Sequence, residues 1–326
     1  MGQPIVPPPV PSSSTGMPQQ SRLAIASMVF GILSFCCLGP FGSIPAIIMG
    51  IIALVKIGNA QAPLQGKGWA VAGLVMGCVS FFLFIIVVPI SLAILLPALA
   101  RAREAARRSA CQGNLKQMGL VYKMFANESK GNYFPELSSE AGRLMCVSKE
   151  IFPDYLTDAG ILICPSDANL TASEQSDLVN ETMIIDKVSY TYLGYVIMSD
   201  DEMEAFAEVY KQRVAQKLPF NEDLDAPPGR GSMGTNKFYR LREGVERELL
   251  NDPNNTSSAA KLLSEIPIMW DMITAGQQGA LFFNHVPGGA NVLFMDGHVE
   301  FRRYPGEWPV SRRSAEILSG LTTMKP

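Results

Sequence analysis

The chain is poor in the residues that usually carry chemistry. It contains only two histidines, and no acidic residue occurs between Ser21 and Ala100. Neither a Gly-rich phosphate loop followed by Lys-Ser/Thr nor a Gly-x-Ser-x-Gly motif is present. The formal net charge of −3 gives no electrostatic footprint of a nucleic-acid partner. We therefore expect no enzyme, no nucleic-acid partner, no small-molecule substrate and no cofactor.

The six cysteines show no Cys-x-x-Cys and no Cys/His zinc spacing. Three lie in apolar runs and are expected to be inert: Cys36, Cys37 and Cys78. The other three lie in polar sequence: Cys111, Cys146 and Cys164. Since three is an odd number, at most one disulfide can form among them. Free or partly buried thiols are the simpler interpretation, and a Cys111–Cys164 disulfide in an oxidising compartment stays open.

Long apolar runs dominate the first hundred residues. Residues 1–20 are rich in Pro, Ser and Gln and predict a disordered tail without a signal peptide. Leu23 to Ile57 is too long for one bilayer-crossing helix of about 20 residues. Gly and Pro interrupt this run between Leu38 and Pro45, which favours a membrane hairpin over residues 21–68. A single tilted and kinked span is the alternative.

The apolar run from Trp69 to Ala100 continues without a clear stop into polar sequence of helical pattern. Residues 69–130 therefore predict a transmembrane helix that extends into a stalk, with kinks at Pro89 and Pro97. The Gly73 and Gly77 pair has the spacing with which membrane helices pack closely, here against the hairpin. In the stalk, a sheet should cover one apolar stripe: Leu115, Met118, Tyr122 and Phe125.

Residues 131–326 predict an α+β head with an antiparallel sheet. Strands are expected at 188–198, 266–270 and 280–284, and helices at about 139–151, 200–218 and 238–250. The clearest local signal is a hairpin over Asn291–Arg303. Asp296-Gly297 there predicts a two-residue turn that pairs Phe294 with Val299 and Val292 with Phe301, so the core lies on the Val292 side.

Two groups of polar side chains could bind a metal. His285, His298 and Asp296 could form a two-histidine, one-carboxylate site. We favour structural roles instead, because Asp296 is needed in the turn and His298 faces a strand partner. An acidic cluster could take calcium, although a helix N-terminus explains it more simply: Asp200, Asp201, Glu202 and Glu204.

Two stretches resemble a known family. Residues 95–135, LLPALARAREAARRSACQGNLKQMGLVYKMFANESKGNYFP, are similar to the start of planctomycete prepilin-like proteins. Residues 284–301, NHVPGGANVLFMDGHVEF, resemble their C-terminal His-x9-Asp-Gly signature, and CPSD at 164–167 also fits. The motif positions, with a structural role expected, are His285, Gly288, Gly289, Asp296, Gly297 and His298. Residues 24–77 separately resemble a small Gly-rich bacterial membrane domain of unknown function.

The resemblance implies a pseudopilin-like component of a type II secretion or type IV pilus-like system. Its partners would be the lipid bilayer and other pilin-like proteins. It also implies a head outside the cytoplasmic membrane, whereas the arginines that follow the third span would alone place the head inside. Two departures matter. The Phe-Thr-Leu-Ile-Glu cleavage segment is absent, and His285 and Asp296 enclose ten residues, Val286 to Met295. A tethered envelope protein that enters no filament is therefore the alternative.

Overall fold

The computed structural model describes residues 20–35, 39–59, 65–167, 189–250, 256–275, 281–285 and 288–324. The chain divides into two compact units, Met1–Leu99 and Ala100–Pro326. All but the last residue of the expected N-terminal tail lies outside the described residues. Each unit is described by itself below.

The first unit consists of helices. It contains α1 (Arg22–Leu33), α2 (Pro40–Gly58) and the first part of α3 (Lys67–Glu128). Two of these, α2 and α3, are long and apolar enough to cross a membrane. With 12 residues, α1 is about 18 Å long and shorter than a hydrocarbon core of about 30 Å. The Ser27 hydroxyl of α1 donates a hydrogen bond to the Ala46 carbonyl of α2 at 2.8 Å.

Glycines let the three helices approach one another closely. A Cβ atom on Gly73 would lie 2.3 Å from Ser27 Oγ and 2.6 Å from the Ser27 carbonyl carbon. A Cβ atom on Gly77 would lie 3.1 Å from the Ser43 carbonyl oxygen. The prediction that this glycine pair packs against the preceding helices is therefore confirmed.

In its last third, α3 forms one wall of the head. The helix continues through Pro89 and Pro97, which both lie inside it. Beyond them, Leu115, Met118 and Tyr122 are fully buried, and Phe125 is half-buried against the same core. A Cβ atom on Gly119 would lie 3.2 Å from Leu293 of the sheet. The expected apolar stripe is confirmed as the face that the sheet covers.

The head is an α+β unit built on a four-stranded antiparallel sheet of order β1-β4-β7-β8. These strands are β1 (Tyr190–Tyr192), β4 (Pro267–Asp271), β7 (Gly289–Phe294) and β8 (Val299–Arg303). Two small sheets pair β2 (Leu224–Asp225) with β3 (Lys237–Phe238) and β5 (Ile273–Ala275) with β6 (Leu281–Phe283). The expected mixed helix and sheet class, with its long helix and antiparallel sheet, is confirmed.

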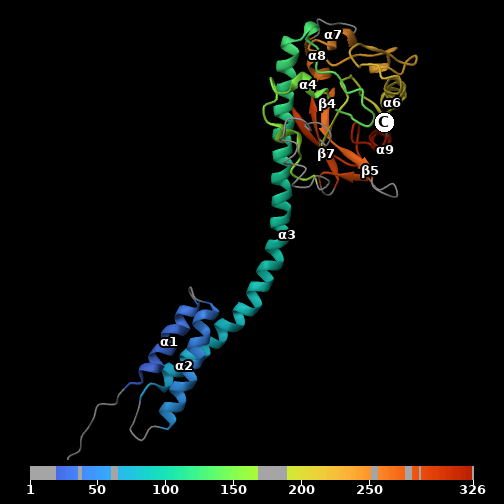
Figure 1. Cartoon of the computed structure of the whole chain (residues 1–326). Coiled ribbons are helices and arrows are strands. Elements are labelled where there is room, and N and C mark those ends of the chain that lie inside the picture. The colour runs from blue at the N-terminus through green and yellow to red at the C-terminus, as the bar shows by residue number, and fades with distance from the viewer. Residues whose placement is uncertain are drawn as a thin grey trace, which may run out of the picture. The chain divides into compact units, whose positions relative to one another are not determined.

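Short helices complete the head. Figure 1 shows β4 and β7 beside the upper part of α3, with α6 and α9 on the other side of these strands. The larger helices are α6 (Asp200–Ala215), α8 (Thr256–Leu263) and α9 (Arg312–Thr322). The single turns are η2 (Lys130–Asn132), α4 (Ser148–Ile151), η3 (Ala159–Leu162), η4 (Ser232–Gly234) and α7 (Glu246–Leu249).

The predictions of helices over 139–151 and 238–250 are mostly wrong. Over 139–151 only α4 is helical, because Gly142 takes a positive φ of 79° and the Ser138 N–H bonds the Met145 carbonyl at 2.9 Å. Over 238–250 the chain starts in β3 and has only the one-turn α7. Phe238 is fully buried as a strand partner of Leu224 there, so tertiary packing overrides the local helical pattern.

The 291–303 hairpin exists, but its predicted register is wrong by one residue. Leu293 pairs with Val299 and Val292 with Glu300, and the Phe294 N–H bonds the His298 carbonyl at 3.0 Å. The loop thus has three residues, 295–297, and ends on Gly297 with a φ of 92°. A type I turn followed by a positive-φ glycine is the usual solution for this loop length. Both faces of β7 are buried, not only the Val292 side.

Candidate metal centre

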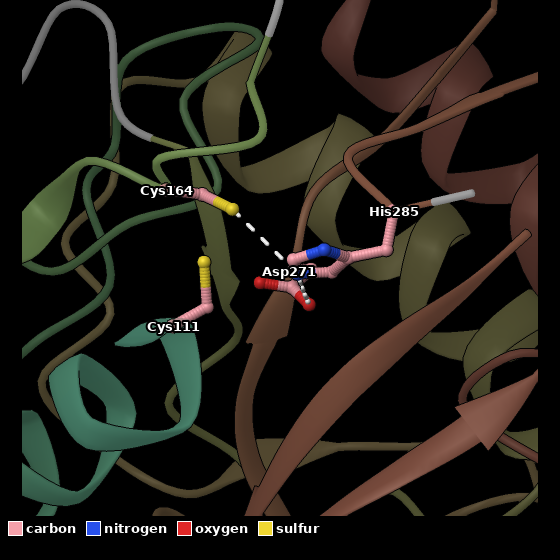
Figure 2. A group of neighbouring side chains, drawn as sticks. All are labelled: Cys111, Cys164, Asp271 and His285. Atoms are coloured by element: carbon pink, nitrogen blue, oxygen red, sulfur yellow. Dashed lines mark hydrogen bonds and ion pairs between the residues drawn. The ribbon is translucent and has the colours of Figure 1, made fainter. Parts of the chain in front are cut away.

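Four buried side chains from four different segments meet inside the head. They are Cys111 of α3, Cys164 after η3, Asp271 at the end of β4 and His285 between β6 and β7. Each offers one ligand atom, and these atoms all lie within 4.8 Å of one another. Figure 2 shows the four side chains directed toward one common point.

Local structure places the two cysteines. Cys111 lies one helical turn before Leu115, on the face of α3 that the core covers. Cys164 opens the CPSD turn, which the Asp167 N–H closes onto the Cys164 carbonyl at 2.9 Å. Asn114 of α3 donates from Nδ2 to the Ile163 carbonyl at 3.0 Å. That hydrogen bond ties the turn to the helix and brings the two thiols together.

Asp271 is held by the neighbouring strand through one of its oxygens. Its Oδ2 accepts hydrogen bonds from the backbone N–H of Asn291 at 2.6 Å and from Asn291 Nδ2 at 2.9 Å. Within the described part of the chain, the other oxygen, Oδ1, is buried and has no hydrogen-bond partner. Leaving such an atom unsatisfied costs about 1–3 kcal/mol, so this oxygen calls for an explanation.

His285 lies between two carboxylates and a thiol. Its Nε2 is 3.2 Å from Asp271 Oδ2 and 3.6 Å from Cys164 Sγ, and its Nδ1 is 3.0 Å from Glu104 Oε1. Burial lowers the pKa of His285. Its interactions with Asp271 and Cys164 outweigh that effect and raise the pKa to about 10.

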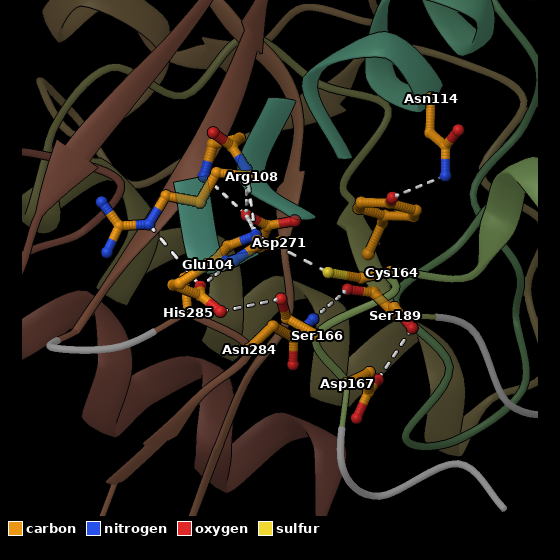
Figure 3. A network of polar contacts seen from close by, with 12 residues as sticks. Glu104, Arg108, Asn114, Cys164, Ser166, Asp167, Ser189, Asp271, Asn284 and His285 are labelled. Carbon is orange, nitrogen blue, oxygen red and sulfur yellow. Dashed lines mark hydrogen bonds and ion pairs between the residues drawn. The ribbon is translucent and has the colours of Figure 1, made fainter. Parts of the chain in front are cut away.

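Glu104 connects this histidine to a wider polar network (Figure 3). Its Oε1 also lies 3.6 Å from Arg108 Nε, and its Oε2 accepts from Ser166 Oγ at 3.4 Å. Both Glu104 and Arg108 belong to α3, one turn apart. The carboxylate beside His285 is therefore held by the helix and by the CPSD turn together.

The two thiols are free, although the sequence left a disulfide between them open. Hydrogen bonding to Cys111, followed by burial, raises the pKa of Cys164 far above its ordinary value. Cys146 is also free and buried, but it lies outside the group and contacts the Tyr122 hydroxyl at 3.7 Å. Burial raises the pKa of Cys146 to about 12.

The structure separates the two histidines that the sequence considered together. His298 is an exposed turn residue whose Nδ1 lies 2.6 Å from Asp296 Oδ1 and whose ring stacks on Phe294 at 4.4 Å. His285 is instead buried with Asp271. The metal site of His285, His298 and Asp296 is therefore not assembled.

The three motif glycines have backbone roles. Gly288 and Gly289 take positive φ angles of 139° and 144°, and Gly297 closes the hairpin turn. A Cβ atom on Gly289 would lie 2.4 Å from the Arg302 carbonyl oxygen. A side chain at this position would push β7 away from β8, so glycine is required where the His285 loop enters the sheet.

The acidic cluster lies in the first turn of α6, where Ser199 caps the helix through Glu202 N–H at 3.3 Å. Glu202 is buried and accepts from the N–H groups of Met198 and Met233 at 2.7 and 3.0 Å. The other three carboxylates contact Ser311, Arg313 or Arg230: Asp200, Asp201 and Glu204. Each of the four carboxylates thus has at least one partner within the protein.

Two family profiles match separate parts of the chain. Residues 23–87 match a domain of unknown function, DUF4190, and residues 100–145 match a protein family of unknown function, DUF1559. DUF1559 is a prepilin-like family of planctomycetes. Over this second stretch the chain is similar to a prepilin-like family. No curated protein and no solved structure matches the chain.

Sequence reasoning missed Asp271 and Glu104. Cys164 and His285 are 121 residues apart, and no short spacing motif connects any of the four side chains. The available signals were weak: a polar residue directly after the buried β4 strand, and a glutamate one turn from an arginine. Cys111 and Glu104 lie within the stretch that matches the prepilin-like family, whereas the other three residues lie outside it.

Proposed function

We propose that the chain is a membrane-anchored, pseudopilin-like structural component of a type II secretion or type IV pilus-like system. The head would lie on the outer side of the bacterial cytoplasmic membrane. In this role the protein acts by packing against other pilin-like proteins and performs no catalysis.

The long helix α3 is the observation that carries this proposal. Its first half is an apolar run long enough to cross a bilayer, and its last third is the wall on which the antiparallel sheet packs. The family match over residues 100–145 falls on that wall. A membrane helix that continues into the core of an α+β head suits a subunit that packs side by side with similar subunits.

The packing of α1 and α2 supports a second candidate, a membrane-tethered envelope protein that enters no filament. Gly73 of α3 fits against Ser27 of α1 so closely that no side chain could be added. Cleavage before α3 would remove this partner and expose the glycine face. The absence of acidic residues from the apolar segments also removes the glutamate that pilins use to pair with a neighbour.

Mass spectrometry of the N-terminus of protein taken from native membranes separates the two candidates. A chain that begins shortly before Trp69, together with co-purification of secretion or pilus proteins, supports the pseudopilin role. A chain that retains residues 22–58 and co-purifies with none of these proteins refutes that role and supports the tethered protein.

The side of the membrane is tested separately. Alkaline phosphatase is active only outside the cytoplasm, so a fusion after Pro326 should be active if the head is external. An inactive fusion that is expressed at the same level would contradict the proposed orientation.

A further inference from the structure

We propose that Cys111, Cys164, Asp271 and His285 bind one zinc ion in a closed, structural site inside the head. The ion would join α3 to the CPSD turn, to the end of β4 and to the loop before β7. This inference does not depend on the pseudopilin role, because it concerns only how the head is held together.

The spacing of the ligand atoms fits tetrahedral zinc. With Zn–S near 2.3 Å and Zn–N and Zn–O near 2.0–2.1 Å, tetrahedral angles place sulfur and nitrogen about 3.6 Å apart, and nitrogen and oxygen about 3.4 Å apart. The observed separations are 3.6 Å from Cys164 Sγ to His285 Nε2 and 3.2 Å from that nitrogen to Asp271 Oδ2, the oxygen of the same carboxylate that lies next to the unpartnered Oδ1. Since all four ligand atoms lie within 4.8 Å of one another, small side-chain rotations would complete the site.

A metal ion would account for a buried atom that the protein leaves without a partner. Among the described residues, Asp271 Oδ1 is buried and has no hydrogen-bond partner, although the ligand atoms of His285, Cys111 and Cys164 lie beside this carboxylate. A dication bound to both sulfurs, the imidazole nitrogen and Asp271 Oδ1 would give each of these buried groups a partner and leave Oδ2 to its hydrogen bonds from Asn291.

The surroundings already have the form of a metal site's outer shell. Metal-bound histidines almost always donate their second ring N–H to a carboxylate or carbonyl. Here Nδ1 of His285 lies 3.0 Å from Glu104 Oε1, so Nε2 would be the coordinating nitrogen, and the ion would replace its 3.1 Å contact with Asn291 Nδ2. Asn291 fixes the Asp271 carboxylate by two hydrogen bonds in the same way.

The donor set selects the ion. Two thiolates and an imidazole suit zinc, whereas calcium and magnesium require oxygen ligands in larger number. All four side chains are at most 1% exposed, so no position is open to water or substrate. A closed site of this kind stabilises a fold and does not catalyse a reaction.

Metal analysis of the full-length protein in detergent tests the proposal. Inductively coupled plasma mass spectrometry of the wild type should find about one zinc per chain, as a four-ligand site holds one ion. Cys164→Ser and His285→Gln should lose most of it. The control is Cys146→Ser, which removes another buried thiol of the head and should keep the zinc. Glu104→Gln should still bind zinc at saturation, with affinity lowered roughly 10- to 100-fold.

X-ray absorption at the zinc edge of the wild type identifies the ligand atoms directly, so the proposal can be tested even if a ligand variant fails to fold. Two sulfur and two nitrogen or oxygen neighbours are expected, at about 2.3 Å and 2.0–2.1 Å. The proposal would be overturned by a zinc content below about a tenth of an equivalent, or by stoichiometric iron or copper in place of zinc. A Cys111–Cys164 disulfide would also overturn it, as would equal zinc loss in Cys146→Ser and Cys164→Ser.

Discussion

Tyr122 of α3 tests whether the stalk and the sheet form one core. The side chain is fully buried, and its ring lies 4.9 Å from the ring of Tyr192 and 6.0 Å from that of Phe134. Truncation to alanine would remove these contacts and leave a cavity between α3 and the sheet. Large-to-small changes of this kind cost about 3–5 kcal/mol.

This loss of stability can be measured as a lower melting temperature. For a domain of about 150–250 residues, each kcal/mol lowers the melting temperature by about 2–4 °C, so Tyr122→Ala should lower it by about 6–20 °C. Tyr122→Phe should cost about 1 kcal/mol or less. The hydroxyl has only two sulfur partners among the described residues, Cys146 Sγ at 3.7 Å and Met269 Sδ at 3.6 Å.

Thermal unfolding of the detergent-solubilised protein, followed by near-UV circular dichroism, measures these shifts. Leu120→Ala is the matched control, because Leu120 lies on the same helix but is 64% exposed. This substitution should change the free energy of unfolding by no more than about 0.5 kcal/mol. Equal melting temperatures for Tyr122→Ala and Leu120→Ala would refute the packing of the sheet on α3.

Three further perturbations test other parts of the structure. Gly73→Val should displace α1 and make this helix more sensitive to protease. Gly68→Val is the control and should not, because a Cβ atom on Gly68 meets nothing within 4 Å. Equal digestion of the two variants would contradict the close packing of α1 on α3. Gly297→Ala should destabilise the head by about 1 kcal/mol, since its φ is 92°; Gly113→Ala, in a helix with open space, should stabilise it. Burial raises the pKa of Glu202 above 4.5, so its protonated form favours the fold and this stability is lost as pH rises through the raised pKa. The melting temperature of Glu202→Gln should therefore rise relative to that of the wild type as the pH increases from about 4 to about 7. A difference in melting temperature that stays constant over this range would contradict this prediction.

Local patterns determined the elements whose signals are contained in the sequence itself. Glycines in membrane-like runs indicated close packing, and the stripe from Leu115 to Tyr122 indicated the face of α3 that the head covers. The cap at Ser199 likewise set the start of α6. In each case residues within about one helical turn of one another determine the local structure, so the sequence alone is enough to predict it.

Tertiary structure decided the rest. The hairpin register depends on a three-residue loop that ends on Gly297, and a one-residue slip exchanges every pair along the strands. Phe238 lies in a strand because a strand partner and the core bury it, against its local pattern.

The candidate metal centre shows this difference most clearly. The sequence determined a long apolar helix that leads into an α+β head, and it singled out His285, Cys111 and Cys164 without connecting the histidine to the thiols. Only the fold adds Asp271 and brings the four ligand atoms within 4.8 Å. The physical reason is that each comes from a separate segment, and contacts between segments far apart in the chain leave no periodic signal in any one of them.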